Sequence, residues 1–89
     1  MDITRHVGPS FRLFREQAEL SQEELGFRAG LDRTYVSGVE RGVRNPSLHS
    51  MQKIASALGI SLDAVFIQAR ALADIRSAAS SRKSKKTLT

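Results

Sequence analysis

The sequence predicts a small all-α protein of five helices. Three observations favour this fold class: a length of 89 residues, apolar residues that recur at three- and four-residue spacings, and Gly, Pro and Ser residues that divide the chain into short segments. No segment alternates apolar and polar residues as a half-buried strand would. The length suits one domain, and a chain with 40% hydrophobic residues and no cysteine must form its core without disulfides or zinc–thiolate sites.

The first helix is expected to run from about Pro9 to Ala18. Proline is tolerated in the first turn of a helix, so Gly8-Pro9 is interpreted as the start signal. The apolar residues that should form its buried face are Val7, Phe11, Phe14 and Ala18.

A helix-turn-helix is expected next. Ser21 and Glu24 fit a capping box, in which the serine hydroxyl accepts from the glutamate amide and the carboxylate accepts from the serine amide. The second helix should therefore start after Ser21 and end near Gly30, which can adopt the left-handed conformation that stops a helix. Asp32 is suited to N-cap the third helix, which should span residues 33–41.

The third predicted helix has an apolar side and a polar side. At about 100° per residue, Val36 and Val39 share the apolar side. The residues on the opposite side are Thr34, Ser37, Gly38 and Arg41, with Arg33 and Tyr35 at the boundary.

Two further helices are expected after a break at residues 42–46. Ser47 should cap the fourth and Gly59 should end it. Its expected buried stripe is Leu48, Met51, Ile54, Ala55 and Leu58. Ser61 should cap the fifth.

The fifth helix is expected to be extended and to contact a partner. Its apolar positions, which continue past what a small core needs, are Leu62, Val65, Phe66, Ala69, Leu72 and Ala73. One helix-turn-helix domain, including the surface for this partner, is expected over residues 1–77. Residues 78–89 are small, polar and basic, and are expected to form a flexible tail.

The charge distribution suggests a nucleic-acid partner more clearly than the net charge of +5 does. The cationic residues of the tail are Arg82, Lys83, Lys85 and Lys86. The early glutamates are Glu16, Glu19, Glu23 and Glu24. Residues 33–53 carry Arg33, Arg41, Arg44 and Lys53 against Glu40 alone. One face of the domain should therefore be basic and another acidic.

Residues 8–66 resemble the lambda-repressor-like (Xre-type, Cro/CI-type) helix-turn-helix regulators of bacteria and phages. The matching features are Arg15, LSQEELG at 20–26, Gly30, Val36 with Val39, ERG at 40–42, NPSL at 45–48 and ALGIS at 57–61. Gly26 departs from the alanine that this family usually has there. Within the family, LDRTYVSGVERG at 31–42 is most similar to the small controller proteins of restriction-modification operons.

The resemblance implies that the third helix enters the major groove of DNA. The expected base contacts are Arg33, Thr34, Tyr35 and Ser37. Arg33 can donate two hydrogen bonds to guanine, and Thr34 can offer its hydroxyl or set its methyl against that of thymine. Gly38 is expected to let the helix lie close to the duplex. The expected contacts to the DNA backbone are Gln22, Arg41, Arg44 and Asn45.

Two further expectations follow from the resemblance and from the long apolar stripe. Arg15 and Glu40 should form a partly buried ion pair that ties the first helix to the third. The residues expected at a dimer interface are Leu62, Val65, Phe66 and Ala69.

The expected function is that of a transcriptional regulator that binds double-stranded DNA as a homodimer, on a palindromic operator with an inverted repeat. RNA polymerase is a further candidate partner. The alternative is an antitoxin that binds a toxin and also regulates its own gene. The genes that neighbour this one would distinguish the two functions. RNA binding is less favoured, because only 6% of residues are aromatic and unpaired bases stack on aromatic side chains.

An enzyme, a cofactor and a metal site are not expected. His6 and His49 stand alone, and no carboxylate pair resembles an acid–base site. No apolar run approaches the ~20 residues of a membrane span, and the N-terminal segment lacks a hydrophobic signal. A cytoplasmic, nucleoid-associated protein without a membrane partner is expected.

Overall fold

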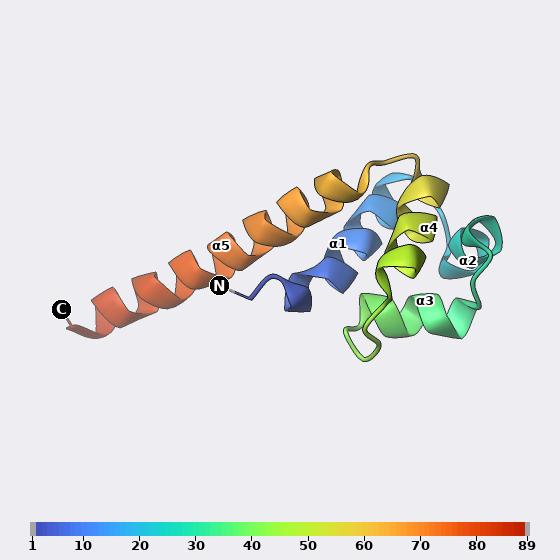
Figure 1. Ribbon diagram of the computed structural model, residues 1–89. Helices are drawn as coiled ribbons and strands as arrows, with labels where there is room; N and C mark the ends of the chain where they lie inside the picture. The colour runs from blue at the N-terminus through green and yellow to red at the C-terminus, as the bar shows by residue number, and fades with distance from the viewer. Residues whose placement is uncertain (1, 89) are drawn as a thin grey trace.

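Five helices make up the chain in the computed structural model, which describes the backbone of residues 2–88 and the side chains of residues 2–76 (Figure 1). The helices are α1 (Thr4–Gln17), α2 (Gln22–Ala29), α3 (Arg33–Glu40), α4 (Leu48–Leu58) and α5 (Leu62–Leu88). The described backbone contains no strand, and the predicted all-α, five-helix fold is confirmed. The basic tail expected at residues 78–89 lies outside the residues whose side chains are described.

Helix α1 begins earlier than the sequence pattern indicated. The Asp2 carboxylate accepts a hydrogen bond of 3.0 Å from the Thr4 amide, which anchors the first turn upstream of the expected start. Pro9 therefore lies inside the helix, and the interpretation of Gly8-Pro9 as a start signal was wrong. Gly8 serves packing instead, because a Cβ at this position would lie 1.9 Å from the carbonyl oxygen of Val39. The glycine lets the backbone of α1 touch the backbone of α3.

The buried side of α1 differs from the expected one at its C-terminal end. Val7 and Phe11 are buried, but Ala18 is exposed and forms the C-cap. Ser10 joins the core although it is polar, because its hydroxyl donates a 2.6 Å hydrogen bond to the carbonyl of His6. The hydroxyl is thus satisfied inside the helix.

Helix α1 lies at the centre of the fold, where it packs against α5, α3 and α4 (Figure 1). Helix α2 packs against α3 and α4. The side chains that meet in the core are Val7, Phe11, Leu25, Ala29, Val36, Val39, Ile54, Ala55, Val65 and Ala69. All five helices contribute to this one cluster, so the position of each helix depends on the others.

Helix α4 has the caps predicted for it. The Ser47 hydroxyl accepts from the Ser50 amide at 3.0 Å, and Gly59 ends the helix with φ of 70°. Ile54 and Ala55 are buried as expected, whereas Leu48 is 65% exposed. Periodicity places Leu48 on the core side of the helix but does not show that the first turn extends beyond the core.

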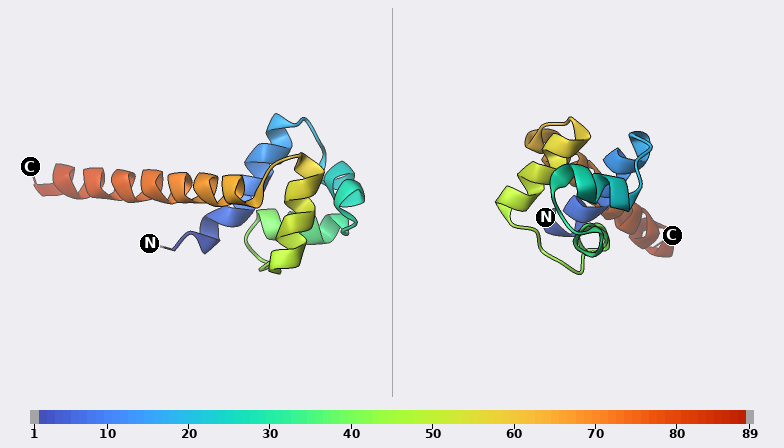
Figure 2. Two further views of the ribbon diagram at one scale, coloured as in Figure 1. Left: turned by 45° about the horizontal axis from the view of Figure 1, so that its top comes forward. Right: turned by 90° about the vertical axis from the view of Figure 1, so that its right-hand side faces the viewer.

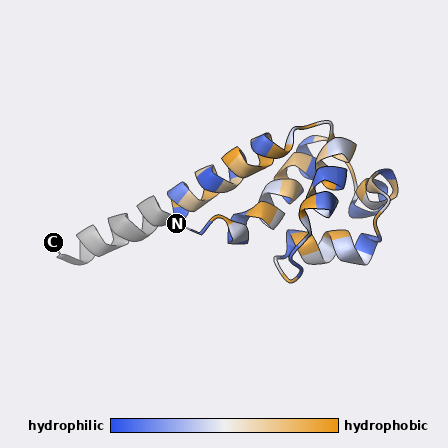
Figure 3. Cartoon of the chain, viewed as in Figure 1, coloured by the Kyte–Doolittle hydropathy of each residue, from blue (hydrophilic) through white to orange (hydrophobic). Residues whose placement is uncertain are grey.

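Helix α5 uses part of its apolar stripe within the protomer. Val65, Ala69 and Ala73 are buried, and α5 packs mainly against α1. Hydrophobic and hydrophilic residues are interspersed along its described part (Figure 3), and Ile67 and Ile75 remain exposed. Among the described residues, no single helix is long and apolar enough to cross a membrane; only α4 and α5 taken together, bent by 98°, meet that length and composition.

Candidate nucleic-acid interface

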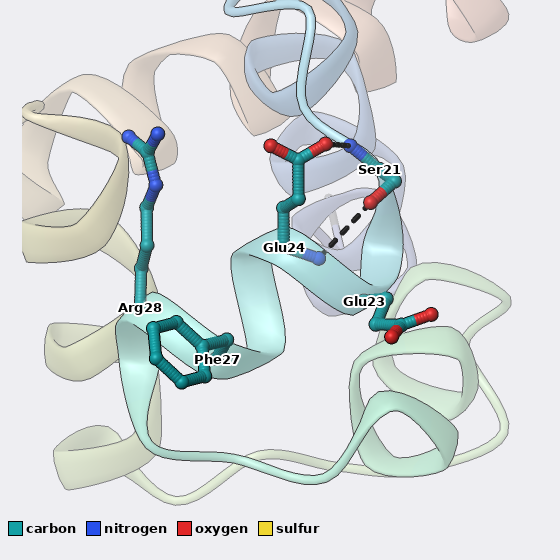
Figure 4. Close-up of a pocket in the computed structure, with 5 residues that line it drawn as sticks. All are labelled: Ser21, Glu23, Glu24, Phe27 and Arg28. Atoms are coloured by element: carbon teal, nitrogen blue, oxygen red, sulfur yellow. Dashed lines mark hydrogen bonds between the residues drawn. The ribbon is translucent and has the colours of Figure 1, made fainter.

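The turn between α2 and α3 is built by local hydrogen bonds that the sequence predicted. The Ser21 hydroxyl accepts from the Glu24 amide at 3.0 Å, and the Glu24 carboxylate accepts from the Ser21 amide at 3.4 Å (Figure 4). Gly30 ends α2 in the left-handed conformation, with φ of 69°. The capping box fixes the start of α2, and Gly30 fixes its end, so the turn toward α3 has a defined direction.

Gly26 permits a close approach of the turn to α2. A Cβ at this position would lie 2.7 Å from the carbonyl oxygen of Leu31, and the Leu31 amide donates to the Gly26 carbonyl at 2.8 Å. An alanine would force the turn away from α2. In this chain, the glycine leaves the space that the Leu31 carbonyl oxygen occupies.

Helix α3 lies at an edge of the molecule (Figures 1 and 2), and its two sides differ in burial. Val36 and Val39, each 1% exposed, face the core. Arg33, Thr34 and Arg41 are exposed, and Ser37 is half-buried. Tyr35 is half-buried and packs against the core. Arg33 and Thr34 are thus the most accessible of the residues expected to contact bases.

The carboxylate of Glu40 joins three helices. It is 4% exposed, and it accepts from Arg15 Nε at 2.7 Å and from Arg15 Nη2 at 3.0 Å. Gln22 Nε2 donates to the same carboxylate at 3.1 Å, and Arg15 Nη1 donates to the carbonyl of Leu20 at 2.7 Å. The hydrogen bonds to Glu40 raise the pKa of the Arg15 guanidinium above its ordinary value. The expected ion pair between Arg15 on α1 and Glu40 on α3 is present, and Gln22 at the start of α2 adds a further hydrogen bond to Glu40.

Two polar groups on the outer side of α3 are engaged within the chain. The Thr34 hydroxyl donates to the Asp32 carboxylate, and Arg41 Nε donates to the carbonyl of Ser37 at 3.4 Å. Asp32 occupies the N-cap position, but its side chain bonds no helix amide, so the expected capping bond is absent there. The Thr34 hydroxyl has already donated its proton, which leaves its methyl and its oxygen lone pairs for any further contact.

Gly38 does not offer the open surface that the sequence analysis expected. It is buried, and a Cβ there would lie 2.8 Å from Cγ of Arg44. The Arg44 side chain crosses α3 at this residue, and its guanidinium carbon lies 5.7 Å from the centre of the Tyr35 ring. The prediction that Gly38 itself approaches the duplex was wrong, because the side chain of Arg44, in the loop after α3, covers it.

The loop after α3 lies against the first turn of α1. A small cavity of about 100 Å³ is lined by Thr4, Arg5, Val7, Gly8, Val39, Gly42, Arg44, Asn45 and Pro46. Arg5 is exposed and shares this cavity with Arg44 and Asn45. Arg5 was not among the predicted contact residues, because the first helix was expected to begin after it. An Asp-x-Thr helix start at Asp2 was the signal that could have revealed it.

The residues expected at a dimer interface occupy two different environments. Val65 and Ala69 are each 0% exposed within the protomer, so they cannot contact a partner without unfolding, and this part of the prediction was wrong. Leu62 and Phe66 are half-buried. An open hollow beside Phe66 is lined by Ile3, Phe66, Ile67 and Arg70. Ile67, 68% exposed, was missed because it lies off the apolar stripe.

The described residues contain no group of three or more His, Cys, Asp or Glu side chains arranged to hold a metal ion.

Residues 11–65 match the helix-turn-helix family HTH_3. The chain belongs to this family. It is 41% identical over 61 residues to an HTH-type transcriptional regulator of Sinorhizobium fredii, a match that covers 68% of this chain and 79% of that protein. It is 46% identical over 55 residues to the control protein C.MunI of a Mycoplasma species, covering 62% of this chain and 74% of that protein.

A solved structure supports the same relationship. The restriction-modification controller protein C.AhdI from Aeromonas hydrophila is 47% identical, with a TM-score of 0.68, and the match covers 70% of this chain and 94% of that chain. The resemblance to Xre-type regulators and controller proteins is confirmed. The HTH_3 chain is a DNA-binding transcriptional regulator and not an enzyme.

Proposed function

We propose that this HTH_3 regulator binds an inverted-repeat operator as a homodimer, with α3 of each protomer in the major groove. The observation that carries the proposal is the division of α3 into a buried side and an accessible polar side. A recognition helix needs both, because it must stay fixed to its domain while its outer side chains reach base edges.

The base contacts are assigned to the outer side of α3. Arg33 is exposed at the first residue of the helix, where its guanidinium can donate two hydrogen bonds to guanine O6 and N7. Thr34 reads DNA through its methyl group or as an acceptor, because its proton is donated to Asp32. Ser37 and Tyr35 complete the base-reading surface.

The phosphate contacts flank this surface. Arg44 and Asn45 in the loop and Arg41 at the end of α3 are exposed. Gln22 stands at the start of α2, where the helix dipole favours a phosphate, and its bond to Glu40 holds its side chain toward α3. Arg5 joins them from α1, since it lies beside Arg44 and Asn45.

The base-reading role is tested with Arg33→Ala and a charge-matched control, Arg28→Ala, which removes an exposed arginine from α2. The probe is a duplex that the wild-type protein selects from a random-sequence library, compared with unselected duplexes at matched salt. Arg33→Ala should lower affinity for the selected duplex by about 1–3 kcal/mol and relax preference at one base pair in each half-site. Arg28→Ala should keep that preference. Equal losses on both kinds of duplex would mean that Arg33 contributes only charge.

The dimer is assigned to the side of α5 that carries Phe66, Ile67 and Arg70. Ile67 is 68% exposed next to a half-buried Phe66, and both border the open hollow with Ile3. An exposed apolar surface of this kind is stabilised when a second copy covers it. A twofold dimer would set the two α3 helices about 34 Å apart, which matches half-sites centred one helical turn apart.

The dimer is tested by sedimentation of Ile67→Asp, with Phe27→Asp as the control. Both replace an exposed apolar side chain, 68% and 88% accessible, and Phe27 lies on α2 (Figure 4). The Ile67→Asp protein should sediment as a folded monomer and bind the selected duplex more weakly, while Phe27→Asp should stay dimeric. A wild-type protein that remains monomeric at tens of micromolar, with and without DNA, would exclude the dimer.

The relatives named as controller proteins support a role in a restriction-modification operon. A neighbouring endonuclease and methylase gene would support this subtype, and a neighbouring toxin gene would favour the antitoxin alternative.

A further inference from the structure

We infer that Gly38 is a positioning residue for DNA binding: its missing side chain provides the seat on α3 that holds Arg44 at the interface. The inference rests on the proposed function, because it takes Arg44 as a DNA contact. It assigns a role to a residue that does not itself touch DNA.

The first support is the course of the Arg44 side chain. A Cβ at residue 38 would lie 2.8 Å from Cγ of Arg44, 3.5 Å from its Cβ and 3.6 Å from its Cδ. The aliphatic stem therefore lies directly across the glycine. Real Cβ atoms do not approach other carbons to 2.8 Å, so any side chain at position 38 would displace the stem.

The second support is the backbone of the loop. The carbonyl of Gly38 accepts from the amide of Val43 at 2.9 Å and from the amide of Arg44 at 3.1 Å. Gly42, with φ of 75°, makes the turn that brings these amides back to the helix. The backbone and the stem of Arg44 thus contact the same residue.

The third support is the ring of Tyr35. Tyr35 precedes Gly38 by three residues, so both lie on the same side of α3. The guanidinium carbon of Arg44 lies 5.7 Å from the centre of the ring, within the range of a cation–π contact. The glycine seats the stem and the tyrosine supports the charged end. An arginine held in this way loses less rotamer freedom when it binds DNA than a free one would.

The Gly38→Ala substitution should displace the Arg44 side chain without destabilising the fold. Arg44 is exposed, so its stem can swing into solvent when a methyl group occupies the seat. Alanine also favours a helix interior more than glycine does. The Gly38→Ala protein should therefore melt at the same temperature as the wild type or higher, while the position of Arg44 is lost.

The binding test is a double-mutant cycle with Gly38→Ala, Arg44→Ala and the double variant, titrated on the duplex selected by the wild type. Each single change should weaken binding about tenfold. The double variant should bind no more weakly than Arg44→Ala, because both changes remove the same contact. Losses that multiply would overturn the inference, since Gly38 would then act independently of Arg44. Arg28→Ala controls for the loss of one positive charge.

A second measurement does not require DNA. In the wild type, the Arg44 side-chain protons near the Tyr35 ring should show upfield ring-current shifts by NMR, and these shifts should disappear in Gly38→Ala and in Tyr35→Leu. Unchanged Arg44 signals in Gly38→Ala would overturn the inference.

The two proposals fail in different ways. If Arg44→Ala binds the selected duplex as tightly as the wild type, Arg44 is not a DNA contact, and the inference falls together with that part of the proposed function. If Arg44→Ala weakens binding and Gly38→Ala does not, only the inference is wrong.

Discussion

The inner and outer sides of α3 are held in different ways. On the inner side, Val36 and Val39 are packed in the core and Glu40 is bonded to two other helices. On the outer side, Arg33 and Thr34 are exposed, and Thr34 is bonded to the neighbouring Asp32 at the start of the helix. On the proposed function, this difference divides stability and DNA contact between the two sides of one short helix. Inner changes should alter the free energy of unfolding, and outer changes should alter DNA affinity.

The largest expected effect on stability is that of Arg15→Met. The change leaves the Glu40 carboxylate, 2% exposed in its side chain, with Gln22 as its remaining donor. Removing one partner of a buried ion pair typically destabilises a protein by about 3–5 kcal/mol, and the partly exposed Arg15 places this pair at the lower end. Urea unfolding followed by circular dichroism measures the loss.

The control for this prediction is the double variant Arg15→Met with Glu40→Leu. It removes both charges, so its stability should return most of the way to that of the wild type. If Arg15→Met were as stable as the wild type, the burial of the Glu40 carboxylate would not depend on Arg15. The apolar residues alone would then hold the inner side of α3.

Gly8→Ala should be the next largest. A Cβ at Gly8 would lie 1.9 Å from the Val39 carbonyl oxygen, and neither backbone can move aside as a flexible side chain can. Overpacking of this kind costs about 1–3 kcal/mol, which the ~1 kcal/mol gain in helix propensity offsets only in part. Thermal melting of Gly8→Ala should give a lower Tm than the wild type, whereas the Tm of Gly38→Ala should not be lowered. Equal melting temperatures for the two alanine variants would contradict the close contact of α1 with α3.

Thr34 tests the outer side with a smaller effect. If its methyl group faces DNA, Thr34→Val should keep most of the affinity for the selected duplex. Thr34→Ser should lose about 1 kcal/mol, because it keeps the hydroxyl and removes the methyl. Neither change should alter the free energy of unfolding by more than about 0.5 kcal/mol. The reverse order of affinities would assign the contact to the hydroxyl, which would then have to leave Asp32.

The smallest effect concerns the first turn of α1. Hydrogen bonds from Thr4 lower the pKa of the Asp2 carboxyl below its ordinary value of 3.8. Because the folded pKa is the lower one, this contribution to stability is present above pH 3.8 and is lost as the pH falls through the lowered value. An NMR titration of the Thr4 amide should give a midpoint below 3.8, and Thr4→Ala should move the Asp2 midpoint upward.

Features that depend on neighbours in sequence were predictable, and those that depend on distant backbone were not. The capping serine Ser21 and the C-capping glycines Gly30 and Gly59 obey local rules, so the ends of α2 and α4 agree with the structure. The roles of Gly8 and Gly38 depend on the Val39 carbonyl and on the Arg44 stem, which no periodicity reveals.

The same limit applies to the surfaces. Val65 and Ala69 belong to a long apolar stripe, but only the packing of α1 shows that this stripe is used within the protomer. Arg5 was missed because its position near Arg44 depends on where α1 begins. The pair of Arg15 with Glu40 came from a family resemblance, since no local pattern links residues so far apart in sequence.

The way in which α3 is anchored also bears on how this regulator can diverge over generations. If Arg33, Thr34 and Ser37 read bases as proposed, substitutions in their codons can change the preferred operator one step at a time, because these side chains lie outside the buried core. Arg15 and Glu40 cannot change singly in this way, because replacing either one leaves the other as an unpaired, partly buried charge until a second mutation removes it. In an alignment of descendants, the outer positions should therefore vary independently, while the Arg15–Glu40 pair should be kept or replaced together.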